Sequence, residues 1–231
     1  MPVSVVIPAL NEAAAIGDLV RETIASGADE VIVVDNGSTD GTAAVAAGAG
    51  ARVIAETRRG YGYACAAGSR VARGDVIVYL DGDRSFDPAQ IPLLTEPIER
   101  GLADLVLGSR PLGGIEPGAM PPHQRWGNDA CSALMSRLYG VRVTDLGPFR
   151  AIRADLLRRL AMGEMTYGWP AEMMVKAAKS GARIVEAGVT YGVRRGGKSK
   201  VSGTLRGSVL AAYYILGVIL RYSVGRGGKL A

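Results

Sequence analysis

Short apolar runs alternate with longer mixed segments along the first half of this chain. Two of the runs, 31–34 and 76–80, contain no internal polar position, which is typical of strands buried on both faces of a parallel sheet. The mixed segments have the length and spacing of helices. Strands are therefore predicted at residues 3–8, 30–35, 52–55 and 75–81, with helices at 11–26 and 62–72. Such βαβ units predict an α/β fold with a parallel sheet and right-handed crossovers.

The second half of the chain is less regular. Residues 110–122 are rich in Gly and Pro and lack periodicity, so we expect a functional lid or a disordered loop there. Elsewhere the pattern predicts strands at 104–109 and 183–189, a strand or turn at 143–150, and helices at 88–100, 124–138, 153–162 and 170–180. With no repeat and no low-complexity linker, we predict one domain over residues 1–203 and a C-terminal apolar helix and basic tail over 204–231.

The C-terminal extension holds an uncharged apolar stretch, residues 207–220, between Arg206 and Arg221. A membrane-spanning helix needs about 20 apolar residues, so this stretch is short for one. A helix that lies in the bilayer interface or packs against a sister subunit is favoured, which allows a homo-oligomer. An ordinary core helix is the alternative.

Charge is distributed unevenly along the chain. The net charge is +5, yet no acidic residue follows Glu186 while eight basic residues do. A basic tail beside an apolar segment favours an anionic surface, either lipid headgroups or nucleic acid. The scarcity of aromatic residues around 194–200 argues against a base-stacking platform, so no nucleic-acid partner is expected.

Cysteine and histidine usage excludes several kinds of site. Cys65 and Cys131 lack the spacing of metal ligands, and His123 is the single histidine. A zinc site normally needs several Cys or His ligands, and Ser–His catalysis would depend on His123 alone, so neither is expected here. The start of the chain lacks the basic and apolar regions of a signal peptide, so we expect a cytoplasmic protein at the inner face of the membrane.

Candidate chemistry gathers where three predicted strands end. Asp81 and Asp83 flank Gly82 after the fourth strand, and polar segments at 8–12 and 35–38 follow the first two. Open α/β sheets bind ligands at the carboxyl ends of their strands. Carboxylate oxygens suit a hard divalent cation that bridges phosphates, although an Asp-Gly-Asp turn can also be an ordinary solvated turn. Together these segments could hold a nucleotide diphosphate.

In this order and spacing the motifs resemble the family 2 glycosyltransferases of GT-A fold, within them the dolichol-phosphate (polyprenyl-phosphate) mannose synthase-like branch. The matching segments are 5–12, 33–42, 81–83, 108–110, 149–150 and 194–200. The resemblance implies a GT-A, Rossmann-like, mostly parallel sheet flanked by helices. It also implies a Mg²⁺ or Mn²⁺ ion held by Asp81 and Asp83, with Asp81 near the donor as well. A glutamine that often assists the metal in that branch is replaced here by Ser85.

The same resemblance implies roles for further residues. Those expected at the nucleotide-sugar donor are Pro8, Ala9, Asn11, Glu12, Asp35, Gly37, Asp81 and Arg110. Phosphate-binding arginines on the acceptor side map onto Arg110, Arg125 and Arg194. Ser199 and Lys200 lie in a glycine-rich basic loop that could close over a phosphate.

These inferences predict an inverting, metal-dependent transfer of mannose or glucose from GDP-mannose or UDP-glucose to a polyprenyl or dolichyl phosphate. Asp83, Arg125 and Arg194 are the expected catalytic residues. A family 2 enzyme that glycosylates a hydroxyl is the alternative, with Glu172 as the base that such an acceptor needs. Glu172 could instead cap its helix. A nucleotidyltransferase or a nucleotide-binding module is a further alternative.

Overall fold

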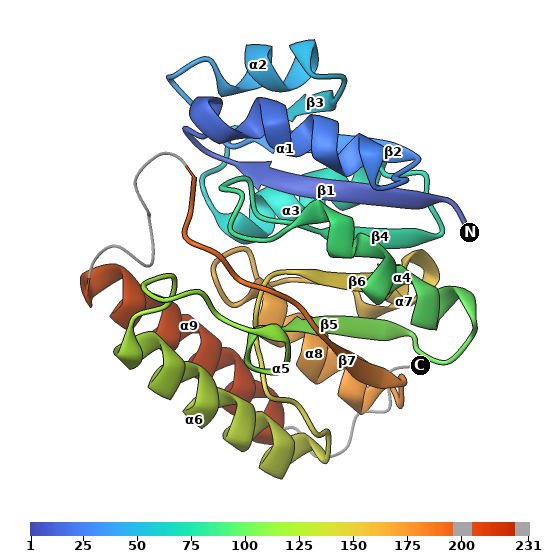
Figure 1. The fold of residues 1–231 in the computed structure, drawn as a ribbon. Helices are drawn as coiled ribbons and strands as arrows, with labels where there is room; N and C mark the ends of the chain where they lie inside the picture. Colours follow the sequence, from blue (N-terminus) through green and yellow to red (C-terminus); the bar gives the residue numbers. More distant parts are fainter. Residues whose placement is uncertain (196–204, 225–231) are drawn as a thin grey trace.

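A computed structural model describes residues 1–195 and 205–224, and these form an α/β fold around one sheet (Figure 1). The sheet has seven strands in the order β3-β2-β1-β4-β6-β5-β7. Every neighbouring pair is parallel except the two pairs that include β6. The predicted α/β fold with a mostly parallel sheet is therefore confirmed. The strands are β1 Val3–Ala9, β2 Glu30–Asp35, β3 Arg52–Ala55, β4 Val76–Tyr79, β5 Leu105–Ser109, β6 Arg150–Arg153 and β7 Ile184–Gly188.

Helices cover both faces of the sheet. One hydrophobic cluster joins the sheet to α1, α2 and α4, and a second joins its other face to α3, α6, α7, α8 and α9. The longer helices are α1 Ala13–Ala25, α3 Tyr61–Val71, α4 Ile91–Glu99, α6 Pro122–Tyr139, α8 Trp169–Lys179 and α9 Leu205–Val224. The shorter ones are α2 Thr42–Gly48, the 3₁₀-helix η1 Pro88–Gln90, α5 Arg110–Gly113 and α7 Ala154–Leu160.

Strand β4 lies in the middle of the sheet and is buried on both sides, as its apolar sequence predicts. Val76 and Val78 pack into one hydrophobic cluster, and Ile77 and Tyr79 pack into the other. Burying an aliphatic side chain of this size stabilises the fold by about 1.5–3 kcal/mol relative to leaving it exposed. The burial fixes β4 in the sheet and holds the turn that follows it, from Asp81 onward, at the carboxyl edge.

The prediction of a strand or turn at 143–150 is wrong in its boundaries. The strand is β6, Arg150–Arg153, and residues 143–149 form an irregular loop before it. Pro148 has no N–H to give to a ladder, which is a physical reason for the strand to start after it. β6 runs antiparallel to β4 and β5.

The first helix does not begin at residue 11 as predicted. Helix α1 begins after Glu12, and Asn11 adopts a left-handed φ of 51°. Its Oδ1 accepts a hydrogen bond from Thr39 N at 2.8 Å, and its own N–H donates to Ser38 Oγ at 2.9 Å. Through these two hydrogen bonds Asn11 connects the loop after β1 to the loop after β2.

The segment 110–122 is partly helical. It opens with α5, and Ile115 forms an isolated bridge with Tyr191 beyond β7. Helix α9 packs along α6 and α8 at one end of the molecule (Figure 1). Val218 and Ile219 of α9 are buried, whereas Leu210, Tyr213 and Leu220 are exposed. None of the helices in the described ranges has both the length and the hydropathy required to cross a bilayer.

Candidate active site

A cavity of about 520 Å³, here called the strand-end cavity, opens at the carboxyl ends of β1, β2 and β4. Its wall includes six of the residues predicted from sequence, namely Pro8, Ala9, Glu12, Asp81, Asp83 and Arg194. The ends of β1, β2 and β4 meet here because β1 lies between β2 and β4 in the sheet. The cavity is at the position where open α/β sheets bind nucleotides.

Asp81 and Asp83 form the acidic floor of the strand-end cavity. Burial and the neighbouring Asp83 carboxylate raise the pKa of Asp81 well above its ordinary range. The Tyr61 hydroxyl donates to Asp81 Oδ1 at 3.3 Å, and Ser85 Oγ donates to Asp83 Oδ1 at 2.5 Å. Two carboxylates so placed repel each other, and a nearby positive charge relieves that repulsion.

Arg194 supplies positive charge to this floor from the other end of the chain. Its Nη2 lies 3.0 Å from Asp83 Oδ2 and 3.0 Å from Glu12 Oε1. The backbone beside it is fixed, since Arg195 N donates to Asp83 O at 3.1 Å. Arg194 Nε and Nη1 are buried and make no hydrogen bond to the part of the chain that the structure describes. These two nitrogens are donors suited to an anion bound in the cavity.

The donor set at the floor fits a hard divalent cation. Within residues 1–195 and 205–224 no three His, Cys, Asp or Glu side chains converge in the manner of an all-protein metal site. Mg²⁺ and similar ions are commonly held by one or two carboxylates together with waters and substrate phosphates. Asp81 and Asp83 meet that pattern, and the guanidinium between Asp83 and Glu12 shows that the position attracts a cation.

A second cavity of about 300 Å³, here called the helix-side cavity, adjoins the first and lies toward α6 and α9. The two cavities share Tyr61, Asp81, Tyr167 and Tyr191 in their walls. The rest of the wall is mainly apolar and includes Met120, Cys131, Leu146, Pro148, Ala211, Ala212 and Ile215. The wall also contains the polar residues Arg110, His123, Gln124 and Asn128. The guanidinium carbon of Arg110 lies 5.2 Å from the centre of the Tyr191 ring. Arg110, predicted at the donor, therefore lies in the wall of the helix-side cavity.

Glu172 lies outside the walls of both cavities. It is buried at the start of α8, where its carboxylate accepts hydrogen bonds from Gly163 N, Glu164 N and the Tyr222 hydroxyl at 2.7–2.9 Å. Lys176 Nζ is 3.0 Å away. Burial raises the pKa of Glu172, but these hydrogen bonds outweigh it and the net shift is downward. The contacts favour a structural role that joins α8 to α9, not the capping of α8 alone.

Several other predicted residues do not line the two cavities. Asn11, Asp35 and Gly37 shape the loops around the strand-end cavity, with Asp35 Oδ1 accepting a hydrogen bond from Ser38 N at 3.0 Å. Arg125 is exposed on α6 and is absent from both walls. Ser199 and Lys200 lie outside the described residues. The roles of these residues stay predictions.

Sequence reasoning missed other parts of the site. Arg59, Gly60 and Tyr61 line the strand-end cavity at the start of α3, after a strand that ends in no recognisable motif. A Cβ at Gly60 would lie 2.5 Å from Met165 O, so glycine is required where these segments meet. Asp145, which holds Arg110, was also missed. The nearest signal was the Phe149–Arg150 pair, at the point where this loop ends and β6 begins.

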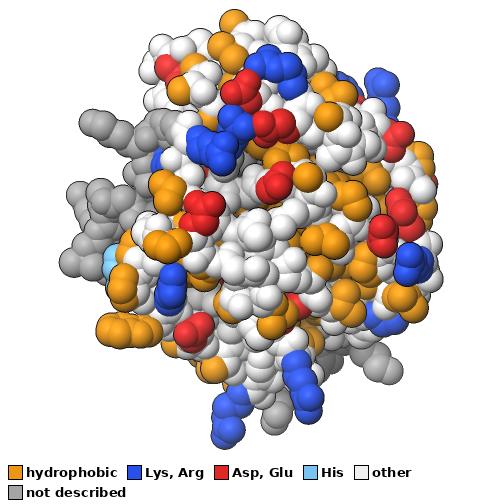
Figure 2. All heavy atoms as spheres, viewed as in Figure 1, with side chains coloured by type: hydrophobic (Ala, Val, Ile, Leu, Met, Phe, Trp, Pro, Cys, Tyr) orange, Lys and Arg blue, Asp and Glu red, His pale blue; other side chains and the backbone are white. Residues whose placement is uncertain are grey.

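Charges on the surface are mixed in sign. On the face drawn in Figure 2, basic and acidic side chains are interspersed. Arg84, for example, pairs with both Asp18 and Glu22. Nucleic-acid-binding surfaces gather their basic residues on one face or along one stripe. The face in Figure 2 does not have that arrangement among the described residues.

Comparison with known proteins matches this site to a large enzyme family. The family model described as Glycosyl transferase family 2 matches residues 4–161. An uncharacterized glycosyltransferase of Mycobacterium tuberculosis is 41% identical over 210 residues, which cover 90% of this chain and 94% of that protein. An undecaprenyl-phosphate mannosyltransferase of Micrococcus luteus is 34% identical over 236 residues, covering 96% of each chain.

The fold comparison agrees with the sequence comparison. The chain is similar to the crystal structure of glucosyl-3-phosphoglycerate synthase from Mycobacterium tuberculosis in complex with Mn²⁺, UDP and phosphoglyceric acid. The TM-score is 0.78 and the identity 25%, over 99% of this chain and 80% of the other. That crystal structure holds Mn²⁺ and uridine diphosphate together.

Proposed function

This chain belongs to glycosyl transferase family 2, and we propose that it transfers a hexose from a nucleotide-diphosphate sugar to a polyprenyl or dolichyl phosphate, with inversion at the anomeric carbon. One observation carries the proposal: the strand-end cavity, which holds Glu12, Asp83 and Arg194, and the mainly apolar helix-side cavity share Asp81 in their walls. A charged sugar nucleotide suits the first cavity, and a lipid with an anionic head suits the second.

The nucleotide diphosphate occupies the strand-end cavity. Asn36 and Arg59 lie on the β2 side of that cavity, where a base and ribose can be held. Asp81, Asp83 and Arg194 lie at the other side, where the diphosphate would be. Arg194 Nε and Nη1 donate to the departing diphosphate and stabilise the charge that develops on it. The base of the donor can be guanine or uracil, and its sugar can be mannose or glucose, in this arrangement of the strand-end cavity.

Asp83 and Asp81 would hold a Mg²⁺ or Mn²⁺ ion against the donor phosphates. When bound, such an ion neutralises charge on the leaving group. Arg194 contacts the same Asp83 carboxylate. Arg194 also contacts the Glu12 carboxylate, so its guanidinium would keep an ion-pair partner if Asp83 bound the metal ion.

The acceptor phosphate enters from the helix-side cavity. Arg110 binds the phosphate, and the apolar wall of α6 and α9 accommodates the first isoprene units. A phosphate is anionic at neutral pH, so it can attack the anomeric carbon without a protein base. This removes the need for a carboxylate in the role predicted for Glu172, and the buried contacts of Glu172 agree with that.

Attachment to the membrane surface is part of the proposal. Leu210, Tyr213 and Leu220 are spaced along one stripe of α9 and are exposed, with Arg221 next to them. Trp126 on the neighbouring α6 is 74% exposed. Apolar and aromatic side chains beside arginines suit the headgroup region of an anionic bilayer. A lipid acceptor would then reach the helix-side cavity from the surface on which the protein rests.

A hydroxyl acceptor is the second candidate, because the structurally similar enzyme is a glucosyl-3-phosphoglycerate synthase. Phosphoglyceric acid also carries a phosphate that an arginine could bind. The apolar wall of the helix-side cavity is the observation that favours a lipid over such a small polar acceptor.

The proposal is tested with the purified full chain, Mg²⁺ or Mn²⁺, and labelled GDP-mannose or UDP-glucose. Parallel reactions contain a short polyprenyl phosphate or 3-phosphoglycerate as acceptor. We expect label to enter the organic phase with the lipid phosphate. Transfer to 3-phosphoglycerate with none to the lipid would overturn the proposal and support the second candidate.

A further inference from the structure

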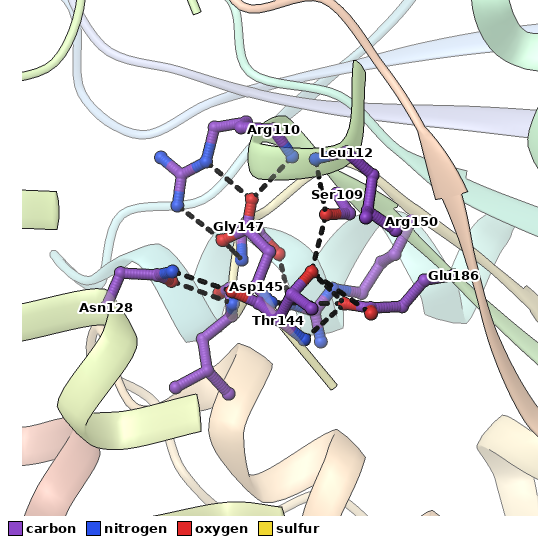
Figure 3. Close-up of polar contacts among 10 residues, drawn as sticks. Ser109, Arg110, Leu112, Asn128, Thr144, Asp145, Gly147, Arg150 and Glu186 are labelled. Atoms are coloured by element: carbon purple, nitrogen blue, oxygen red, sulfur yellow. Dashed lines mark hydrogen bonds and ion pairs between the residues drawn. The ribbon is translucent and has the colours of Figure 1, made fainter. Parts of the chain in front are cut away.

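Asp145 is a fully buried carboxylate in the loop before β6, and Arg110 is its main partner (Figure 3). Asp145 Oδ2 accepts hydrogen bonds from Arg110 N at 2.9 Å and Arg110 Nε at 2.7 Å. Asp145 Oδ1 accepts from Arg110 Nη2 at 2.6 Å and from Gly147 N at 2.9 Å. The paired contact fixes the plane of the guanidinium as well as its position, which a single hydrogen bond would not do.

The loop that carries Asp145 is held by three separate elements (Figure 3). Asn128 of α6 donates from Nδ2 to Thr144 O at 2.9 Å. Glu186 of β7 accepts from Thr144 N at 2.8 Å and from Asp145 N at 3.1 Å. Ser109 Oγ at the end of β5 lies 2.7 Å from Thr144 Oγ1. The carboxylate is therefore anchored to the sheet and to α6 at once.

This arrangement leaves one edge of the Arg110 guanidinium for a ligand. Nη1 makes no hydrogen bond to the described residues, while Nε and Nη2 are engaged with Asp145. Tyr191 packs against the face of the guanidinium. Arg110 is also in the wall of the helix-side cavity, together with Asp81. The remaining edge thus belongs to a side chain in the wall of the cavity where the acceptor would bind.

We propose that Asp145 is a positioning residue, which holds Arg110 so that its remaining edge binds the phosphate of the acceptor. The proposal rests on the proposed function and adds to it a residue that acts through another. Asp145 cannot help through charge, because a carboxylate near the site repels an anionic ligand. Its benefit is geometric, since it orients a flexible side chain before the ligand arrives.

Removal of the Asp145 charge should strengthen the binding of an anionic ligand, whereas loss of the fixed Arg110 geometry should weaken it. A binding experiment on Asp145→Asn therefore separates the two explanations. Dissociation constants are measured by calorimetry for farnesyl phosphate, and separately for UDP or GDP with Mn²⁺, on the full chain. In Asp145→Asn we expect affinity for farnesyl phosphate to fall about tenfold, the effect of one charge-assisted hydrogen bond. Affinity for the nucleotide should change less than twofold. If removal of the negative charge tightens farnesyl phosphate binding, the proposal is overturned.

A double-mutant cycle with Arg110 tests whether Asp145 acts through it. Arg110→Lys loses the planar edge. If Asp145 works only by orienting that edge, Asp145→Asn should weaken binding less than twofold in the Arg110→Lys background. Full additivity of the two substitutions would refute the inference. Should Asp145→Asn fail to fold, Asn128→Ser loosens the same loop and should weaken farnesyl phosphate binding selectively, to a smaller extent; an unchanged affinity would overturn the proposal.

The Arg153–Asp155 pair offers a matched control. The Asp155 carboxylate accepts hydrogen bonds from Arg153 Nε at 2.9 Å and from Arg153 Nη2 at 3.1 Å. Asp155 lines neither cavity. Asp155→Asn should leave both affinities unchanged. Because binding is measured in place of turnover, a wild-type chain that binds farnesyl phosphate but transfers no sugar to lipid phosphates would refute the proposed function alone. A wild-type chain that does not bind it would refute the present inference.

Discussion

The strand-end cavity and the helix-side cavity meet at Asp81 but are built from different material. The strand-end cavity uses the carboxyl ends of three neighbouring strands, where buried apolar runs fix the backbone and short polar segments follow directly. The helix-side cavity uses a helix start, an irregular loop and two helices that pack on each other. In the first cavity Arg194 pairs with the carboxylates of Asp83 and Glu12. The second cavity is lined mainly by apolar residues and contains Arg110, which Asp145 holds.

The difference indicates how the two cavities divide their tasks. A charged donor needs oppositely charged groups that are already in place, since reorienting them during the reaction would cost free energy. A lipid acceptor gains affinity from apolar area and needs few directed contacts. The same distinction predicts that substitutions in the two cavities will have separable effects.

The largest effect is expected in the strand-end cavity. Asp83→Ala removes the carboxylate shared by Arg194 and the proposed metal ion, and sugar transfer should fall on the order of 10³-fold. A chelator should have a comparable effect on the wild-type chain. Transfer of labelled sugar is measured at saturating lipid phosphate.

Asp87→Asn is the control for that substitution. Asp87 lies four residues further on, caps η1 by accepting a hydrogen bond from Ala89 N, and lines neither cavity. Its replacement should leave transfer unchanged. Undiminished transfer in Asp83→Ala, or in the presence of the chelator, would contradict the role given to the acidic floor.

A smaller effect is expected in the helix-side cavity. Ala212→Phe places a ring into the apolar wall that α9 contributes. An overfilled pocket costs about 1–3 kcal/mol, so the KM for polyprenyl phosphate should rise by a factor of about 5 to 150. The KM for the nucleotide sugar should stay within twofold. Steady-state kinetics with each substrate varied in turn measures both. Equal changes in the two KM values would show that the cavities do not divide the substrates.

Glu172→Gln should affect stability more than activity. The substitution weakens the contacts of a carboxylate that accepts from Gly163 N, Glu164 N and the Tyr222 hydroxyl. A loss of about 1–3 kcal/mol is expected, or a fall in Tm of several degrees. Transfer should remain within about threefold of wild type. Tyr222→Phe removes one of the same hydrogen bonds and should lower Tm by less. Abolished turnover in Glu172→Gln with an unchanged Tm would favour a hydroxyl acceptor.

The smallest effect concerns stability at low pH. The pKa of Glu172 in the folded chain lies below its ordinary value of 4.5, because its hydrogen bonds outweigh the effect of burial. A depressed folded pKa contributes stability above pH 4.5 and loses it as the pH falls through the folded value. Denaturant unfolding between pH 6 and pH 3 should therefore show a steeper loss for wild type than for Glu172→Gln. Parallel curves would contradict the assigned contacts.

The strand-end cavity could be predicted from sequence far better than the helix-side cavity, for a physical reason. An uninterrupted apolar run predicts a buried strand, and the residues that follow such a strand lie at the edge of the sheet. Asp81, Asp83 and Glu12 were found in this way. Arg194 was named because of a resemblance, since no local pattern shows that residue 194 returns to the floor beneath β4.

The helix-side cavity has no comparable signal. Asp145 lies in a loop whose boundaries were predicted incorrectly, and its partner Arg110 is 35 residues away. Cys131 and Ile215 look like ordinary core positions, because an apolar wall and a core helix have the same pattern. Such a cavity depends on how α6, α9 and the loop pack, which the spacing of residues along each segment does not encode.

The central claim is that the acceptor's nucleophile is a phosphate on a lipid. It is tested most directly by offering the enzyme a polyprenyl phosphate and the polyprenol of the same chain length, each alone and in competition, with one labelled donor. We expect transfer to the phosphate and at most trace transfer to the alcohol, with a product in which a phosphate links sugar and lipid. Comparable glycosylation of the polyprenol would contradict it.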